Sequence, residues 1–133
     1  STITIYAVFV SARAIKNLNK DYHPVNNKWL QTSSGPYASF LSEDVHYRVY
    51  YDKKGRWVAS IKSYDEWHMP KDLRKLVRQA YYDHKIVNCA ELEVVASKGE
   101  PTYIVTVQDE TGFKKLRIYG YNIEVLKDLK FPK

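Results

Sequence analysis

The side chains that could support covalent or metal-dependent chemistry are few in this sequence and widely spaced. Cys89 is the only cysteine, and no His signature lies near it to act as the base that a nucleophile needs. His23, His46, His68 and His84 form no H-x-x-x-H or H-E-x-x-H pair for zinc. No glycine-rich nucleotide-binding loop occurs. We therefore expect no enzyme activity, no metal site and no cofactor.

The cysteine itself fits a structural role better than a chemical one. Its Val-Asn-Cys-Ala setting is typical of a small residue on a strand, although a reactive thiol is the alternative. As the only cysteine in the sequence, Cys89 can form no disulfide within the chain.

A repeated Arg-x-Tyr pattern is the best candidate for a binding surface. Residues two apart on a strand lie on the same face, so each Arg shares a face with its Tyr. Tyr and Arg supply many hot spots of protein interfaces. Ordinary sheet packing is the alternative, because cross-strand Tyr–Arg contacts also stabilise exposed sheets. The predicted Tyr–Arg stripe consists of His46, Arg48, Tyr50, Lys115, Arg117 and Tyr119.

The positive charge is concentrated in the first half of the sequence. The net charge is +6, and residues 1–64 hold nine Lys and Arg against four Asp and Glu, whereas residues 65–133 hold twelve against eleven. An anionic partner could use this excess, but a cluster such as Lys53, Lys54 and Arg56 at one turn is more commonly part of a solvated loop. Because the excess is modest and no RNP-like motif occurs, we expect no nucleic-acid partner.

The elements that would position these residues are mostly strands. Residues 46–64 predict a hairpin whose turn, Asp52 to Gly55, combines a capping Asp with a Gly that tolerates positive φ. Helices are predicted over 11–22, with Ser11 as N-cap, and over 70–82, with Pro70 at the first position. The other predicted strands are 25–32, 37–42, 86–96, 102–108, 113–119 and 123–129.

Periodicity also assigns the buried faces. The first helix is expected to bury Ala12, Ile15, Leu18 and Tyr22, and the second Leu73, Leu76, Val77, Ala80 and Tyr81. In the hairpin, the covered face is predicted to carry Tyr47, Val49 and Tyr51 on one strand and Trp57, Ala59 and Ile61 on the other. Trp29, Trp57 and Phe40 are expected in the core, and Trp67 is expected to plug the connector between the two halves.

The order of these elements is helix, four strands, helix, four strands. It indicates an internal repeat with a period of 60–66 residues. We expect one α+β domain over 1–133, built of repeat 1 (8–64) and repeat 2 (70–131). Each repeat would be one helix plus a four-stranded antiparallel meander, with the helices packed on one face of a curved sheet.

Several of these residues together resemble a known group of proteins. The pattern comprises Tyr50-Tyr51-Asp52-x-x-Gly55-x-Trp57, Ile61, Met69-Pro70, Leu73 and Tyr81-Tyr82. It is similar to the PepSY-like proteins of Bacteroidetes, small exported domains that are also similar to the β-lactamase-inhibitor-protein (BLIP-like) fold. The resemblance covers about residues 11–131.

The resemblance implies a secreted protein, periplasmic or extracellular, with no known catalysis. It implies a binding module, inhibitor-like in character, that presents an open sheet face to an unidentified protein or peptide. A periplasmic protein that binds a small ligand is the alternative. No apolar run is long enough to span a membrane. The start at Ser1 suggests a trimmed chain, and residues 3–10 fit a strand or the entry to a helix better than part of a signal sequence.

Overall fold

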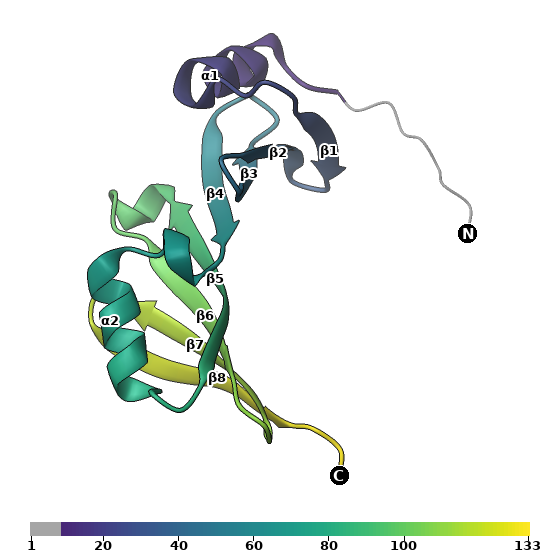
Figure 1. Ribbon diagram of the computed structural model, residues 1–133. Helices are drawn as coiled ribbons and strands as arrows, with labels where there is room; N and C mark the ends of the chain where they lie inside the picture. The colour runs from purple at the N-terminus through teal and green to yellow at the C-terminus, as the bar shows by residue number, and fades with distance from the viewer. Residues whose placement is uncertain (1–8) are drawn as a thin grey trace. The chain divides into compact units, whose positions relative to one another are not determined.

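The helices and strands follow the predicted order. The computed structural model describes residues 9–133, so the expectation placed on residues 3–10 falls outside it up to residue 8. Within the described residues, the elements are α1 (Ala12–Tyr22), β1 (Lys28–Thr32), β2 (Gly35–Ser42), β3 (Val45–Tyr51), β4 (Trp57–Tyr64), the 3₁₀-helix η1 (Glu66–His68), α2 (Lys71–Ala80), β5 (Lys85–Val94), the 3₁₀-helix η2 (Val95–Ser97), β6 (Thr102–Gln108), β7 (Gly112–Tyr119) and β8 (Asn122–Lys130) (Figure 1).

The strands form one antiparallel sheet in sequence order, from β1 to β8. The α+β class and the two successive meanders are therefore confirmed. The chain divides into two compact units, which meet in sequence between Ser60 and Ile61, and each is described by itself below. The proposed repeat bounds, 8–64 and 70–131, stay a prediction.

In the first unit, α1 begins as the sequence indicates. Ser11 is the N-cap, and its Oγ accepts a hydrogen bond from the N–H of Ala14 at 3.1 Å. Ala14 and Leu18 are buried and lie one turn apart, whereas Ile15 is 42% exposed. The predicted stripe was therefore wrong in its first turn, since Ala14 replaces Ala12 and Ile15 on the covered face.

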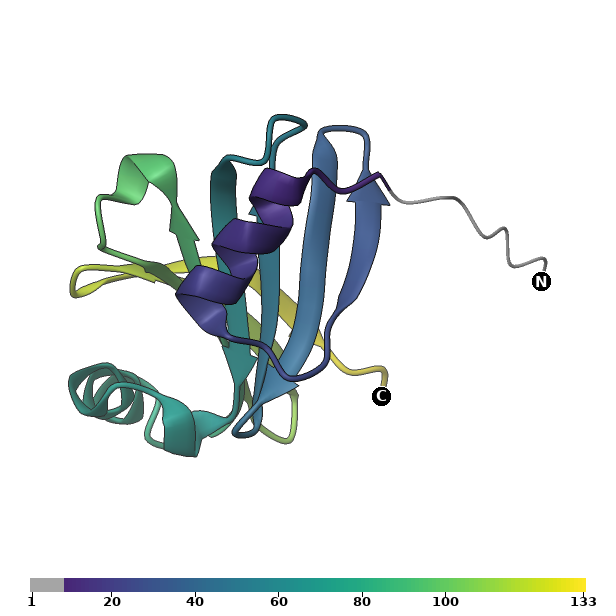
Figure 2. The same ribbon diagram turned by 90° about the horizontal axis from the view of Figure 1, so that it is seen from above.

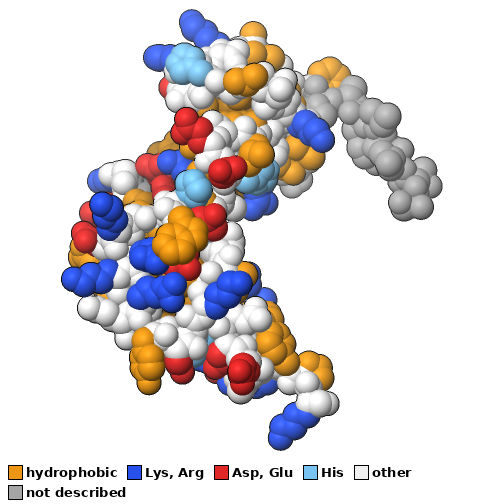
Figure 3. Space-filling model, in the orientation of Figure 1, with side chains coloured by type: hydrophobic (Ala, Val, Ile, Leu, Met, Phe, Trp, Pro, Cys, Tyr) orange, Lys and Arg blue, Asp and Glu red, His pale blue; other side chains and the backbone are white. Residues whose placement is uncertain are grey.

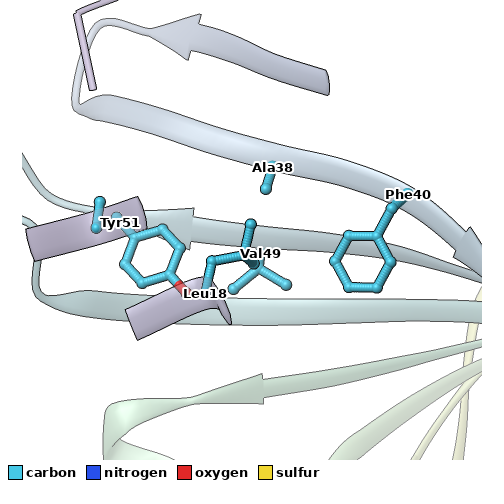
Figure 4. Close-up of a cluster of buried hydrophobic side chains, with 6 residues drawn as sticks. Leu18, Ala38, Phe40, Val49 and Tyr51 are labelled. Carbon is cyan, nitrogen blue, oxygen red and sulfur yellow. The ribbon is translucent and has the colours of Figure 1, made fainter. Parts of the chain in front are cut away.

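The core of the first unit lies between α1 and strands β2 and β3 (Figure 2). Leu18 of α1 lies in one cluster with Ala38 and Phe40 of β2 and with Val49 and Tyr51 of β3 (Figure 4). Each buried side chain of this size stabilises the fold by roughly 1.5–3 kcal/mol. Trp29 and Trp57 pack against this cluster and Phe40 belongs to it, so the core position predicted for these three aromatic residues is confirmed.

The turn between β3 and β4 is fixed to the start of α1. Asp52 Oδ1 accepts hydrogen bonds from the backbone N–H groups of Lys54 and Arg56, both at 2.9 Å, which confirms the capping role. Gly55 has φ of +82°, and a Cβ at this position would lie 2.5 Å from Ser11 Oγ. Asn17 Nδ2 of α1 also donates to the Gly55 carbonyl at 3.1 Å. Only glycine fits this contact.

The predicted covered face of β4 is wrong in part, because Trp57 packs against the core as predicted but Ser60 is buried as well. Ser60 of β4 is 2% exposed, although the sequence placed Trp57, Ala59 and Ile61 on the covered face and Ser60 opposite. Its Oγ lies 2.6 Å from the Tyr22 hydroxyl of α1 and accepts a hydrogen bond from Trp57 Nε1 at 2.9 Å. A small polar side chain is buried here because its hydroxyl is satisfied.

In the second unit, α2 buries Leu73 and Val77, as predicted, whereas Ala80 is exposed. Its other side carries Lys and Arg side chains, which lie among acidic ones in Figure 3. Strands β5 to β7 bury alternate residues in register: Cys89 pairs with Val105, and Val105 with Leu116. The predicted strand 86–96 ends earlier, at Val94, where η2 begins.

The connector before α2 is held by an ion-pair cluster. Glu66 of η1 is 9% exposed and accepts hydrogen bonds from Arg74 Nε at 3.0 Å and Arg78 Nη2 at 2.9 Å. Trp67 is 71% exposed, with the Arg74 guanidinium 4.5 Å from its ring centroid. The expectation that Trp67 plugs the connector was therefore wrong, because a surface cation covers the ring instead.

Candidate functional site

In the first unit, the face of β1–β3 opposite the buried core carries half of the predicted stripe. We call it the outer face. Ala38 and Val49 point to the core, so their neighbours Tyr37, Ser39, Arg48 and Tyr50 point away from it. The strand register aligns these side chains in rows across the strands. The rows are Leu30–Tyr37–Tyr50, Lys28–Ser39–Arg48 and Leu41–His46.

An aromatic stack occupies the first of these rows. The rings of Tyr37 and Tyr50 are 4.8 Å apart at their centroids and inclined by 25°. Stacked aromatic pairs contribute about 0.5–1.5 kcal/mol beyond the area they bury. Tyr50 is therefore held in a fixed position on the outer face, with Leu30 on the far side of Tyr37.

Arg48 lies in the second row with an unusual lack of partners. Its Nε is buried, and within residues 9–133 that atom has no hydrogen-bond partner. Ser39, directly opposite on β2, shares a 2.9 Å hydrogen bond with His46 Nε2. Buried guanidinium nitrogens are normally paired, because desolvating a charged donor without an acceptor is costly.

In the second unit, Arg117 has a partner that the sequence analysis did not identify. Its Nε and Nη2 donate to Glu124 Oε2 across the β7–β8 pair, at 3.1 and 2.6 Å. Tyr119 is 51% exposed at the end of β7, and Lys115 is half-buried. The charge of Arg117 is therefore balanced within its own hairpin.

The structure thus places three stripe residues on the outer face of the first unit and three on β7. Whether the six residues act as one binding surface stays a prediction. Sequence analysis missed Tyr37, Ser39 and Glu124, each of which contacts a stripe residue. Alternation along residues 37–42 places Tyr37 and Ser39 opposite Ala38 and Phe40, but the cross-strand pairing depends on register, which one sequence does not specify.

Each unit has a surface hollow, and the one in the first unit lies next to a stripe residue. One of about 430 Å³ in the first unit is bordered by Lys28, Ser39, Leu41 and His46. One of about 300 Å³ in the second unit lies between α2 and the ends of β6 and β7. The residues that border the second hollow are Pro70, Asp72, Leu73, Leu76, Glu100, Pro101, Tyr103, Gly120 and Tyr121.

Two of the histidines have structural roles. The His84 side chain is 8% exposed, with its Nδ1 2.7 Å from Asp83 Oδ1 and its Nε2 3.4 Å from Asp109 Oδ2. His23 adopts the left-handed conformation that ends α1. Over residues 9–133, no group of three or more His, Cys, Asp or Glu side chains could hold a metal ion.

Burial controls the titratable groups in the interior. Burial raises the pKa of the Cys89 thiol to about 12, so the thiol is protonated at neutral pH. Burial also raises the pKa values of Tyr51 and of Tyr64, whose hydroxyl donates to Glu91 Oε1 at 2.7 Å. These groups remain neutral, which agrees with a structural role for Cys89.

Comparison with known proteins identifies the fold. No protein-family model matches the chain, and no curated protein matches it. Among solved structures, a BLIP-like protein from Bacteroides fragilis matches with a TM-score of 0.71 and 17% identity, over 96% of each chain. A DUF2874 family protein from Bacteroides ovatus matches with a TM-score of 0.70 and 15% identity, over 91% of this chain and 87% of that one.

A third solved structure adds a description of cellular location. It is a "putative periplasmic" protein from Bacteroides eggerthii, with a TM-score of 0.69 and 15% identity over 92% of this chain and 89% of that one. Within the described residues, no helix has both the length and the apolar character to cross a membrane. At these identities the matches show the fold, and the chain is similar in fold to BLIP-like proteins of Bacteroides, as its sequence pattern indicated.

Proposed function

We propose that this protein is a non-catalytic exported module that binds a protein or peptide through the outer face of its sheet. The observation that carries the proposal is the ordered set of aromatic and cationic side chains on β2 and β3. Tyr50 is fixed by its stack on Tyr37, and Arg48 lies in the neighbouring row with a buried, unpaired Nε. Rigid aromatic rings beside a guanidinium are typical of interface hot spots.

The comparisons support the proposal at the level of fold and location. The chain is similar to a BLIP-like protein over almost its whole length, and one similar structure is described as "putative periplasmic". Periplasmic export and the absence of catalysis are therefore part of the proposal. An inhibitor-like role would make the partner an enzyme whose rate falls when the module binds.

Partner capture from periplasmic extract tests the proposal. Immobilised wild-type protein is compared with the double variant Tyr50→Ala/Arg117→Ala, which removes one stripe residue from each unit. We expect wild type to retain a specific partner and the variant to lose at least about 90% of it, because interface hot spots typically cost 2 kcal/mol or more when truncated.

The matched control is Tyr82→Ala/Arg13→Ala. Both residues are exposed, lie outside the stripe and have the same chemical types. The control should capture as much partner as wild type. Equal capture by the stripe variant, or no partner specific to wild type, would show that the stripe is ordinary sheet surface.

The hollow beside α2 favours a second candidate, a small-ligand-binding protein. Tyr103 and Tyr121 border it together with Leu73 and Pro101, which gives apolar walls, while Asp72 supplies a polar group. This function predicts that Tyr103→Ala/Tyr121→Ala abolishes binding of 1-anilinonaphthalene-8-sulfonate, an anionic dye that fluoresces in apolar sites, to the folded protein. Probe fluorescence that does not differ from wild type would exclude the hollow as a ligand site.

A further inference from the structure

The arginines of this chain differ in how their charges are balanced. Arg56, Arg74, Arg78 and Arg117 each pair with a carboxylate at 2.6–3.0 Å. Among the described residues, no carboxylate or other acceptor pairs with Arg48, although its Nε is buried. Because a charged donor without an acceptor is costly, an external acceptor that reaches this guanidinium would be stabilised by it.

The strands that carry the row with Arg48 contribute only cationic or neutral side chains to it. Lys28, Ser39 and Arg48 are aligned across β1, β2 and β3, so two cations flank one hydroxyl. The three strands contain no Asp or Glu. The nearest acidic residues in sequence are Asp44, in the β2–β3 turn, and Asp52, which pairs with Arg56, and no ion pair with Arg48 is present among the described residues.

The neighbouring rows determine what kind of anion would fit. The Tyr37–Tyr50 stack, with Leu30 beside it, lies on one side of the cationic row, and Leu41, 69% exposed, lies on the other with His46. A compact inorganic anion would contact the cations alone. A peptide that carries a carboxylate between aromatic or apolar residues would contact all three rows.

We propose that the Lys28–Ser39–Arg48 row binds a carboxylate side chain of an acidic peptide segment, with a neighbouring aromatic residue of that segment resting on the Tyr37–Tyr50 stack. The inference rests on the proposed binding function and specifies its partner. Arg is suited to this role because its planar guanidinium can donate two parallel hydrogen bonds to one carboxylate.

Peptide titration of the ¹⁵N-labelled full chain tests the inference. The probe is an acetylated, amidated pentapeptide of sequence Gly-Glu-Tyr-Glu-Gly, and the matched probe replaces both Glu with Gln. We expect the acidic probe to produce saturable NMR shifts at the Arg48 Nε–H and at the amides of Lys28 and Ser39. Arg48→Gln should weaken the affinity about tenfold, because a charge-assisted hydrogen bond contributes about one such factor.

Two control variants and one competitor make the result decisive. Arg13→Gln removes an exposed arginine of α1 and should leave the affinity unchanged. Lys28→Gln removes the second cation from an exposed position and should weaken binding less than Arg48→Gln. The amide spectrum shows whether each variant is folded. Equal binding of the Gln probe, shifts that spare Arg48, or inorganic phosphate that binds as tightly as the peptide would overturn the inference.

The inference and the proposed function can fail separately. If Arg48→Gln captures the periplasmic partner as well as wild type does, the carboxylate site is wrong while sheet-face binding stands. If the stripe variant Tyr50→Ala/Arg117→Ala captures as much as wild type, the proposed function fails regardless of the peptide titration.

Discussion

The β3–β4 turn and the β7–β8 turn follow matching Arg-x-Tyr strands, yet they are held in different ways. At the first turn, Gly55 lies against the start of α1, and Asp52 caps two backbone N–H groups. At the second, a Cβ on Gly120 would meet nothing within 4 Å, and Tyr121 is 72% exposed.

The strands beside the two turns also differ, in whether their arginine has a partner across the hairpin. Arg117 and Glu124 form an ion pair across the β7–β8 hairpin, while Arg48 has no such partner among the described residues. The first hairpin is thus held through its turn and leaves a cation available on its face. The second is held across its strands and leaves its turn exposed.

The largest effect should come from Gly55, with Gly120 as its matched comparison. Gly55→Ala should destabilise the protein by about 3 kcal/mol, because positive φ strains an alanine and the new Cβ would lie 2.8 Å from the Ala14 nitrogen. Gly120→Ala, also at positive φ but in open space, should cost about 1 kcal/mol. Urea unfolding of both variants measures the difference. Equal costs would mean that contact with α1 does not fix the first turn.

A smaller effect is expected from the polar contact inside the first unit. Ser60→Ala should cost about 2 kcal/mol, because it removes the acceptor of the Trp57 indole N–H and a partner of the Tyr22 hydroxyl. The control Ser63→Ala changes a less buried serine of the same strand and should cost less than about 0.5 kcal/mol. Thermal unfolding measures both, and an unchanged indole N–H shift in Ser60→Ala would contradict the contact.

The cross-strand ion pair of the second hairpin should contribute still less to the free energy of unfolding. Its side chains are 49% and 58% exposed, so the coupling between Arg117→Ala and Glu124→Ala should be about 0.5 kcal/mol in a double-mutant cycle. High salt should reduce this coupling, since the charges are exposed. A coupling of zero at low salt would remove the proposed contrast between the two hairpins.

The smallest effect on stability should appear only at acidic pH. Hydrogen bonds from the Thr111 hydroxyl and backbone N–H hold the pKa of Asp109 at about 2, below its usual 3.8. Since the folded-state pKa is the lower one, this stabilisation is present above pH 3.8 and is lost as pH falls towards 2. Asp109→Asn should therefore flatten the decline of stability over this range. An identical acid profile in the variant would contradict the assignment.

Local signals in the sequence predicted most of the elements. Alternation predicted β6 at its observed bounds, Thr102–Gln108, and the turn chemistry of Asp52 and Gly55 is as expected. Ser11 was identified as a cap because its hydroxyl can satisfy a free N–H of the helix. These features depend on residues close in sequence, which is why one sequence is sufficient to find them.

The incorrect predictions concern residues whose burial depends on partners that are distant in the sequence. Ser60 is buried because the Tyr22 hydroxyl, 38 positions away, lies against it, and periodicity alone favours apolar Ala59 and Ile61. The candidate site shows the same limit. Its faces follow from alternation, but the Tyr37–Tyr50 stack and the missing partner of Arg48 depend on register.

The buried cysteine has a practical consequence for studying the second unit. Cys89 is fully buried, and its raised pKa keeps the thiol protonated, so alkylating reagents should reach it only when the surrounding strands separate. As the only thiol in the chain, it gives a native labelling site that needs no engineering. The rate at which it is alkylated therefore reports how often strand β5 opens.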